Sequence, residues 1–161
     1  MYIRQPTDKG TYLLIVRLDR QTRIQAGKLG TFDLDAGRYA YIGSAMGPGG
    51  LAARLSRHKR QDKRLHWHID YLLQQGTLAY VLYVESPIRL ECAWACAIDR
   101  LPGAYRPIPR FGSSDCACPS HLIGLSPTLA DQAIQAALVE TLPLQSSQVH
   151  KLNFDVPFNQ C

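Results

Sequence analysis

Apolar residues in this chain gather in short runs that are separated by turn residues. Residues 10–18, GTYLLIVRL, form a near-continuous apolar run, which predicts a strand buried on both faces. Residues 38–43, RYAYIG, alternate and place Tyr39 and Tyr41 on one face of a second strand. Residues 78–84 predict a third strand from their β-branched and aromatic composition. Together these runs indicate a sheet.

Other stretches repeat their apolar residues at helical spacing. One helix begins at Leu51, and a second begins near Trp67 and ends at Gly76. Residues 90–101 predict a third helix, which Pro102-Gly103 ends. Residues 128–140 predict a fourth, with Ser126 as its cap and Pro127 at its first position.

Two shorter runs, residues 22–26 and 30–34, predict a hairpin inserted between the first two strands. The order of elements therefore predicts an α+β fold, with a small antiparallel or mixed central sheet flanked by helices. A length of 161 residues suits one main domain with a tail. We divide the chain into a domain over residues 1–122 and a C-terminal helical extension over residues 123–161, of which 145–161 receive no assignment.

Composition supports a folded globular chain, because 46% of the residues are hydrophobic and 19% are charged. No stretch approaches the roughly 20 apolar residues that span a membrane, and the first residues lack the apolar core of a signal peptide. These observations predict a cytoplasmic protein without membrane contact.

The formal net charge is +5, and the positive residues are concentrated in one segment. Between positions 54 and 64, six basic residues accompany the single acid Asp62: Arg54, Arg57, Lys59, Arg60, Lys63 and Arg64. Such a patch favours binding to a polyanion, and the alternative is a solvated helix face.

Several of these residues occur in a familiar order. Gly10-Thr11-Tyr12 on the first strand and Tyr41-Ile42-Gly43 on a later one, followed by a helix that carries Arg54, resemble the GIY-YIG nuclease superfamily. With residues 65–71, LHWHIDY, and 111–122, FGSSDCACPSHL, the chain resembles a small branch of that superfamily, found alone or fused to endonuclease III-type DNA glycosylases. The resemblance covers residues 9–122.

The resemblance implies a sheet with the two motif strands side by side at its centre. It also implies a metal-dependent endonuclease that acts on DNA, in which Tyr12, Tyr41, Arg54 and Glu91 surround one Mg²⁺ or Mn²⁺ ion. Arg54 offers a planar fork to phosphate oxygens, and Glu91 supplies the hard oxygen that Mg²⁺ prefers. The structural alternative makes the tyrosines core aromatics and Glu91 a helix cap residue.

Further site residues follow from the same helix. Similar proteins carry His or Tyr at the position of His58, which would assist proton transfer or orient a tyrosine; the alternative is a surface histidine. The remaining basic residues are the predicted nucleic-acid contacts: Arg57, Lys59, Arg60, Lys63 and Arg64. The interval between Tyr12 and Tyr41 is longer than the superfamily's usual link, and we assign the excess to the inserted hairpin.

Five cysteines, an odd number, suit free thiols or a metal better than a disulfide framework. Cys116, Cys118 and His121, with His66 or His68, have the ligand chemistry of a Zn²⁺ site. Their spacing is not a common zinc signature, which favours a packed loop with inert thiols. Cys92 and Cys96 are predicted core residues of the third helix, and Trp67 is predicted to pack at the start of the second.

Two functions are consistent with these residues. The first is a metal-dependent endonuclease that hydrolyses a phosphodiester bond in DNA, in repair or recombination. The second is a catalytically weak nucleic-acid-binding module that uses the basic segment and partners a DNA-repair enzyme.

Overall fold

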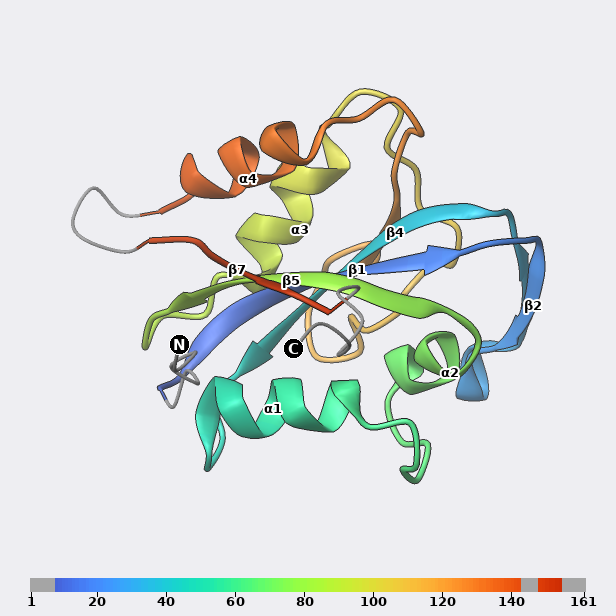
Figure 1. Cartoon of the computed structure of the whole chain (residues 1–161), viewed down its shortest axis with the longest axis horizontal. Helices are drawn as coiled ribbons and strands as arrows, with labels where there is room; N and C mark the ends of the chain where they lie inside the picture. Colours follow the sequence, from blue (N-terminus) through green and yellow to red (C-terminus); the bar gives the residue numbers. More distant parts are fainter. Residues whose placement is uncertain (1–7, 143–147, 155–161) are drawn as a thin grey trace, which may run out of the picture.

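The computed structural model describes residues 8–142 and 148–154 and is built around one antiparallel sheet. The strand order is β6-β4-β1-β5-β7, so the predicted motif strands β1 and β4 are neighbours in the middle of the sheet (Figure 1). The bounds are β1 Gly10–Leu18, β4 Gly37–Ala45, β5 Thr77–Glu85, β6 Leu122–Gly124 and β7 His150–Asn153. The strands that were predicted over residues 10–18, 38–43 and 78–84 are therefore confirmed.

Helices cover both faces of this sheet. In Figure 1, α1 (Gly50–Lys59) and α2 (His68–Gln75) lie on one face, and α3 (Glu91–Asp99) and α4 (Asp131–Val139) lie on the other. Successive residues of β1 point to opposite faces, so Tyr12 and Leu14 join the core beneath α1 and α2 while Leu13 and Ile15 join the core beneath α3 and α4. Burial on both sides explains why the β1 sequence is apolar at nearly every position.

The predicted hairpin is confirmed as a separate two-stranded sheet. Strands β2 (Thr22–Gln25) and β3 (Thr31–Leu34) are joined by the short 3₁₀ turn η1 (Gly27–Leu29). Ile24 and Leu34 are buried in the core that α2 also contacts. The insertion thus extends one end of the domain near α2 (Figure 1).

The α+β class is confirmed, and the described part of the predicted extension joins the main domain. The predicted division after Leu122 falls within β6, which pairs with β4. Strand β7 lies in the segment that received no assignment and pairs with the outer side of β5, and α4 packs on α3. Within residues 8–142 and 148–154, no helix has the length and apolarity of a membrane span.

Several local predictions were wrong. The fourth helix begins at Asp131, and the Ser126 hydroxyl instead accepts from the Thr128 backbone N–H in the preceding turn at 3.3 Å. The third helix is shorter than predicted, because it ends at Asp99. Cys92 and Cys96 were predicted in its core, but both are exposed; Trp94, Ala95 and Ile98 form the buried face instead.

Candidate functional site

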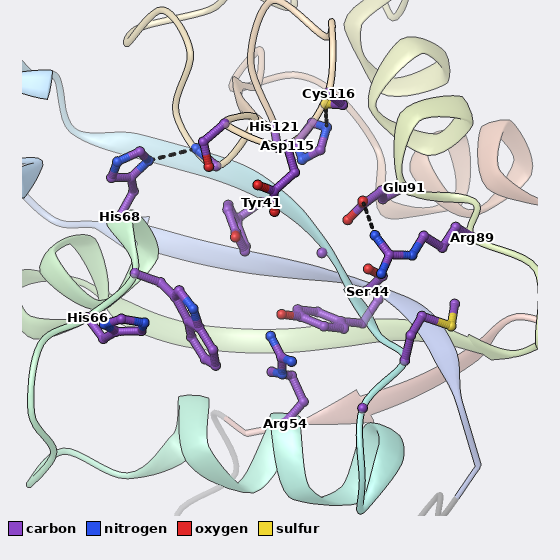
Figure 2. Close-up of a pocket in the computed structure, with 17 residues that line it drawn as sticks. Tyr41, Ser44, Arg54, His66, His68, Arg89, Glu91, Asp115, Cys116 and His121 are labelled. Atoms are coloured by element: carbon purple, nitrogen blue, oxygen red, sulfur yellow. Dashed lines mark hydrogen bonds and ion pairs between the residues drawn. The ribbon is translucent and has the colours of Figure 1, made fainter.

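An open pocket of about 550 Å³ lies beside the ends of β1 and β4. Four of the predicted site residues line it although they come from four elements: Tyr12 from β1, Tyr41 from β4, Arg54 from α1 and Glu91 from α3. Figure 2 shows Arg54 reaching into this space from the α1 side and Glu91 from the opposite side. The fold therefore brings together the residues that the sequence had indicated.

Tyr12 is held in one position by its neighbours on β4 and α1. Its partner across the strands is Gly43, and a Cβ atom at that position would lie 2.5 Å from the Tyr12 hydroxyl. Glycine at position 43 therefore leaves room for the phenol ring. The Tyr12 hydroxyl is 2.7 Å from Nε2 of His58, and the ring is fully buried apart from its edge on the pocket.

His58 lies behind Tyr12 rather than on the pocket wall. It is only 2% exposed and packs near the Tyr41 and Trp67 rings, so the surface alternative is wrong. Burial, and then the charge of Lys63, lowers the pKa of His58 to about 3. The imidazole is therefore neutral at physiological pH, and it acts on Tyr12 as a hydrogen-bond partner.

Tyr41 has a freer hydroxyl than Tyr12. Its ring meets Phe111 edge to face at 5.9 Å, and a Cβ on Gly112 would lie 2.7 Å from it. Among the described residues, none hydrogen-bonds the Tyr41 hydroxyl. Burial raises the pKa of both site tyrosines above the usual phenol value, and the charge of Arg54 acts in the opposite direction on each.

Arg54 points at the pocket without an acidic partner among the described residues. Its guanidinium carbon lies 4.3 Å from the centroid of the Trp67 ring, and its positive charge opposes the effect of burial on the pKa of Tyr12. Stacking fixes the plane of the guanidinium while leaving donors for a ligand. Trp67 packs at the start of α2, as predicted.

Glu91 occupies the first turn of α3, and the start of that helix is tied to β1. The Leu90 N–H donates to the Thr11 hydroxyl at 3.1 Å. The Glu91 carboxylate lies 3.8 Å from Arg89, and its charge raises the pKa of both Tyr12 and Tyr41. Glu91 lines the same pocket as the two tyrosines.

The sequence reasoning missed two charged residues of the pocket, Asp115 and Arg89. Asp115 adds a second carboxylate opposite α1, from the loop between residues 106 and 121. The signal for it was weak, since an acid in a Ser-rich loop is common. The one indication in the sequence was that Asp115 directly precedes Cys116, a candidate metal ligand.

Apart from Arg54, the residues of the basic segment divide into two sets. The first set is paired with the fully buried Asp70. Both terminal nitrogens of Arg57 donate to the Asp70 carboxylate at 2.8 Å. Nζ of Lys63 donates to two backbone carbonyls of α1 and lies 3.9 Å from the same carboxylate. Burial opposes ionisation of Asp70, but hydrogen bonds from Arg57 and from two backbone N–H groups hold its pKa at about 2. The other set is exposed: Lys59, Arg60 and Arg64.

A second group of ligand atoms lies next to the pocket. The ligand atoms of Cys92, Cys116, Cys118 and His121 all lie within 4.8 Å of one another, so this cluster could hold a metal ion. The predicted fourth ligand was wrong, because Cys92 occupies that place. His68 instead accepts a hydrogen bond from the Gly112 N–H at 2.9 Å, as Figure 2 shows.

These features define an α+β protein with a polar, tyrosine-lined pocket between its central strands and two helices. The chain belongs to the family described as Domain of unknown function DUF123, whose model matches residues 11–142. No curated protein and no solved structure matches the chain significantly.

Proposed function

We propose that this chain is a metal-dependent endonuclease of the GIY-YIG type, which hydrolyses a phosphodiester bond in DNA. One observation carries the proposal: Tyr12, Tyr41, Arg54 and Glu91, taken from four separate elements, line one pocket open to solvent. The residues of the Gly-Thr-Tyr and Tyr-Ile-Gly motifs also pair directly, with Tyr12 opposite Gly43.

The pocket side chains suit a phosphate group. Arg54 presents a guanidinium fork without a competing acid among the described residues, and Arg89 adds a second positive charge on the opposite wall. The Tyr41 hydroxyl is available to donate to a phosphate oxygen or to a water molecule. The Tyr12 hydroxyl, which is hydrogen-bonded to Nε2 of His58, belongs to a side chain that lines the same pocket as Arg54.

The carboxylates fit a hard divalent cation. Glu91 and Asp115 both line the pocket, and Mg²⁺ or Mn²⁺ prefers such oxygen ligands while keeping several water molecules. A bound Mg²⁺ would supply charge neutralisation at the phosphate and would favour ionisation of a nearby water or phenol. This contribution matters here because burial raises the pKa of both phenols, which keeps them protonated, and so unable to accept a proton, without a nearby cation.

Cleavage assays on the full chain test the proposal. Branched, nicked and duplex DNA, with RNA of the same sequence, are incubated with Mg²⁺ or Mn²⁺ and then with EDTA. We expect metal-dependent cleavage of DNA that falls by about 100-fold or more in Tyr41→Phe, Arg54→Ala and Glu91→Gln. Glu85→Gln is the matched control, because Glu85 ends β5 and does not line the pocket. Equal activity in Glu91→Gln and wild type would contradict the role of Glu91.

The raised phenol pKa values also support a second function, a catalytically weak nucleic-acid-binding module that partners a DNA-repair enzyme. In that case, the wild type cleaves none of the substrates with either metal. Arg54→Ala still lowers its affinity for DNA, as measured by fluorescence anisotropy. Cleavage by the wild type that Glu91→Gln abolishes would rule the second function out.

A further inference from the structure

We propose that Cys92, Cys116, Cys118 and His121 bind one structural Zn²⁺ ion that fastens the loop over residues 106–121 to the first turn of α3. The set has the composition of a Cys₃His zinc site, in which soft thiolates and one imidazole complete a tetrahedron. The loop contributes three of these ligands and α3 contributes the fourth, so the ion is a cross-link between two parts of the fold.

The distances within the cluster suit this ion. Ligand atoms about 2.0–2.3 Å from one Zn²⁺ in a tetrahedron lie roughly 3.3–3.8 Å apart. The four atoms here lie within 4.8 Å of one another, and Sγ of Cys116 lies 3.4 Å from Nε2 of His121. Small rotations of exposed or half-buried cysteine side chains cover the remaining distance.

His121 is buried and is held by its backbone on both sides. It is 2% exposed. Its backbone N–H donates to the Phe111 carbonyl at 2.8 Å, and its backbone carbonyl accepts from the Ile42 N–H of β4 at 3.0 Å. Nε2 of the imidazole lies 3.4 Å from Sγ of Cys116. The backbone contacts therefore hold His121 in place with its ring nitrogen beside the thiols of the cluster.

The loop itself supports a cross-link. It contains no helix or strand between residues 106 and 121, and long irregular segments are uncommon in compact domains unless something holds them. Arg110 has the left-handed φ of 63°, a conformation that side chains other than glycine rarely adopt. Its guanidinium donates to the Cys118 carbonyl at 2.8 Å, which holds the loop backbone in place beside the cluster.

The ligands adjoin the pocket carboxylates in the sequence. Cys92 follows Glu91, and Cys116 follows Asp115, so an ion in the cluster would set the positions of both carboxylates at once. Cys116 and His121 also line the pocket directly. Any effect of zinc loss on cleavage rests on the proposed nuclease function, whereas zinc content and folding do not.

Metal analysis of the full chain, purified without a His tag, tests the site. We expect about one equivalent of Zn²⁺ by mass spectrometry of the metals, and at least about a tenfold loss in Cys92→Ser and Cys118→Ser. Cys96→Ser is the matched control: this exposed cysteine, further along α3, lies outside the cluster and should keep the full equivalent. Less than about a tenth of an equivalent in the wild type, or a full equivalent in Cys92→Ser, would overturn the proposal.

A second measurement uses the wild-type protein alone, so its result does not depend on how the variants fold. Zinc is removed from the wild-type protein with a chelator under reducing conditions, and Co²⁺ is added. We expect the absorption bands of tetrahedral Co²⁺ with thiolate ligands, together with recovery of the melting temperature that chelation lowers. Octahedral Co²⁺ spectra, or a disulfide between these cysteines in the protein as purified, would also overturn the proposal. Cleavage assays on the same samples report separately on the nuclease function.

Discussion

Arg54 and Arg57 lie one turn apart on α1, but the structure uses them in opposite ways. Both guanidinium groups lie over the Trp67 ring, at 4.3 Å and 4.0 Å from its centroid. Arg57 is neutralised by the buried Asp70, whereas Arg54 faces the pocket with no acidic partner among the described residues. Identical side chains in one basic segment thus differ, because Arg57 stabilises the fold whereas the guanidinium of Arg54 is left available in the pocket.

The difference teaches that charge density along a sequence overstates the charge available for binding. Asp70 is 0% exposed and receives hydrogen bonds from Arg57 and from the N–H groups of His66 and Trp67, each at 2.8 Å. It therefore ties the end of α1 to the start of α2. The positions of Trp67 and Arg54 depend on this network.

The largest expected effect comes from removing the buried acid. Asp70→Asn leaves Arg57 and Lys63 without their buried counter-charge, and breaking a buried ion pair in this way costs about 3–5 kcal/mol of unfolding free energy. Urea denaturation measures this loss of unfolding free energy. Asp62→Asn is the control, because the exposed Asp62 should change stability by less than about 0.5 kcal/mol. Equal stability of the two variants would contradict a structural role for Asp70.

The two arginines should separate stability from ligand binding. Arg57→Ala is expected to lower the unfolding free energy by about 2–4 kcal/mol, because Asp70 loses its bidentate partner. Arg54→Ala should cost about 1 kcal/mol or less, from the lost stacking on Trp67, yet lower DNA affinity more than Arg57→Ala does. Denaturation and fluorescence anisotropy on both variants check this. If Arg57→Ala lowered DNA affinity more than Arg54→Ala does, the proposed division of roles between the two arginines would be wrong.

A pH-dependent effect, which is small near neutral pH, is expected from His58. Its pKa is about 3 in the folded state against 6.5 for an ordinary histidine, so the unfolded chain binds the extra proton as the pH falls below 6.5. This contribution is complete above pH 6.5 and declines toward pH 3, by at most about 1.4 kcal/mol per pH unit. His58→Gln should flatten the decline between pH 6.5 and 4, above the range in which Asp70 titrates. Parallel stability curves for the variant and the wild type would be the contrary result.

The smallest effect concerns the exposed cations. If Arg60 and Arg64 each contact one phosphate of duplex DNA, replacing either by Gln should reduce the slope of log affinity against log salt by about 0.9. Arg57→Gln should change this slope less, since its charge is already paired. Anisotropy titrations over a range of KCl concentrations measure these slopes. An equal change in all three variants would show that pairing with Asp70 leaves Arg57 free to bind DNA.

Much of the fold could be predicted because hydrophobic pattern and burial agree. The β1 run is apolar on both sides and sits at the sheet centre, and the hairpin was visible from its turn residues. Strand β7 could not be predicted, because its residues at the sheet edge are mostly exposed and polar. The true start of α4 was missed since Ser126-Pro127 forms a turn of its own.

The site was predictable where a motif carried it and hidden where partners are distant in the sequence. The sequence around Arg57 does not indicate that this arginine forms an ion pair with Asp70, because the acid lies beyond the basic segment. Likewise, helical spacing suggested a buried Cys92, but the helix face that carries it turns toward the loop with Cys116 and Cys118. Only the packing of the loop against α3 brings those residues together.

Gly43 makes the two motifs dependent on each other. Because the Tyr12 ring occupies the space that a side chain at position 43 would need, the tyrosine of one strand and the glycine of the next form a single steric unit. A similar chain that keeps the tyrosine but carries alanine at this position must swing the phenol away from its histidine. Glycine at this position in a related sequence therefore indicates that the tyrosine has room for the orientation seen here. A larger residue there indicates that the tyrosine ring lies elsewhere.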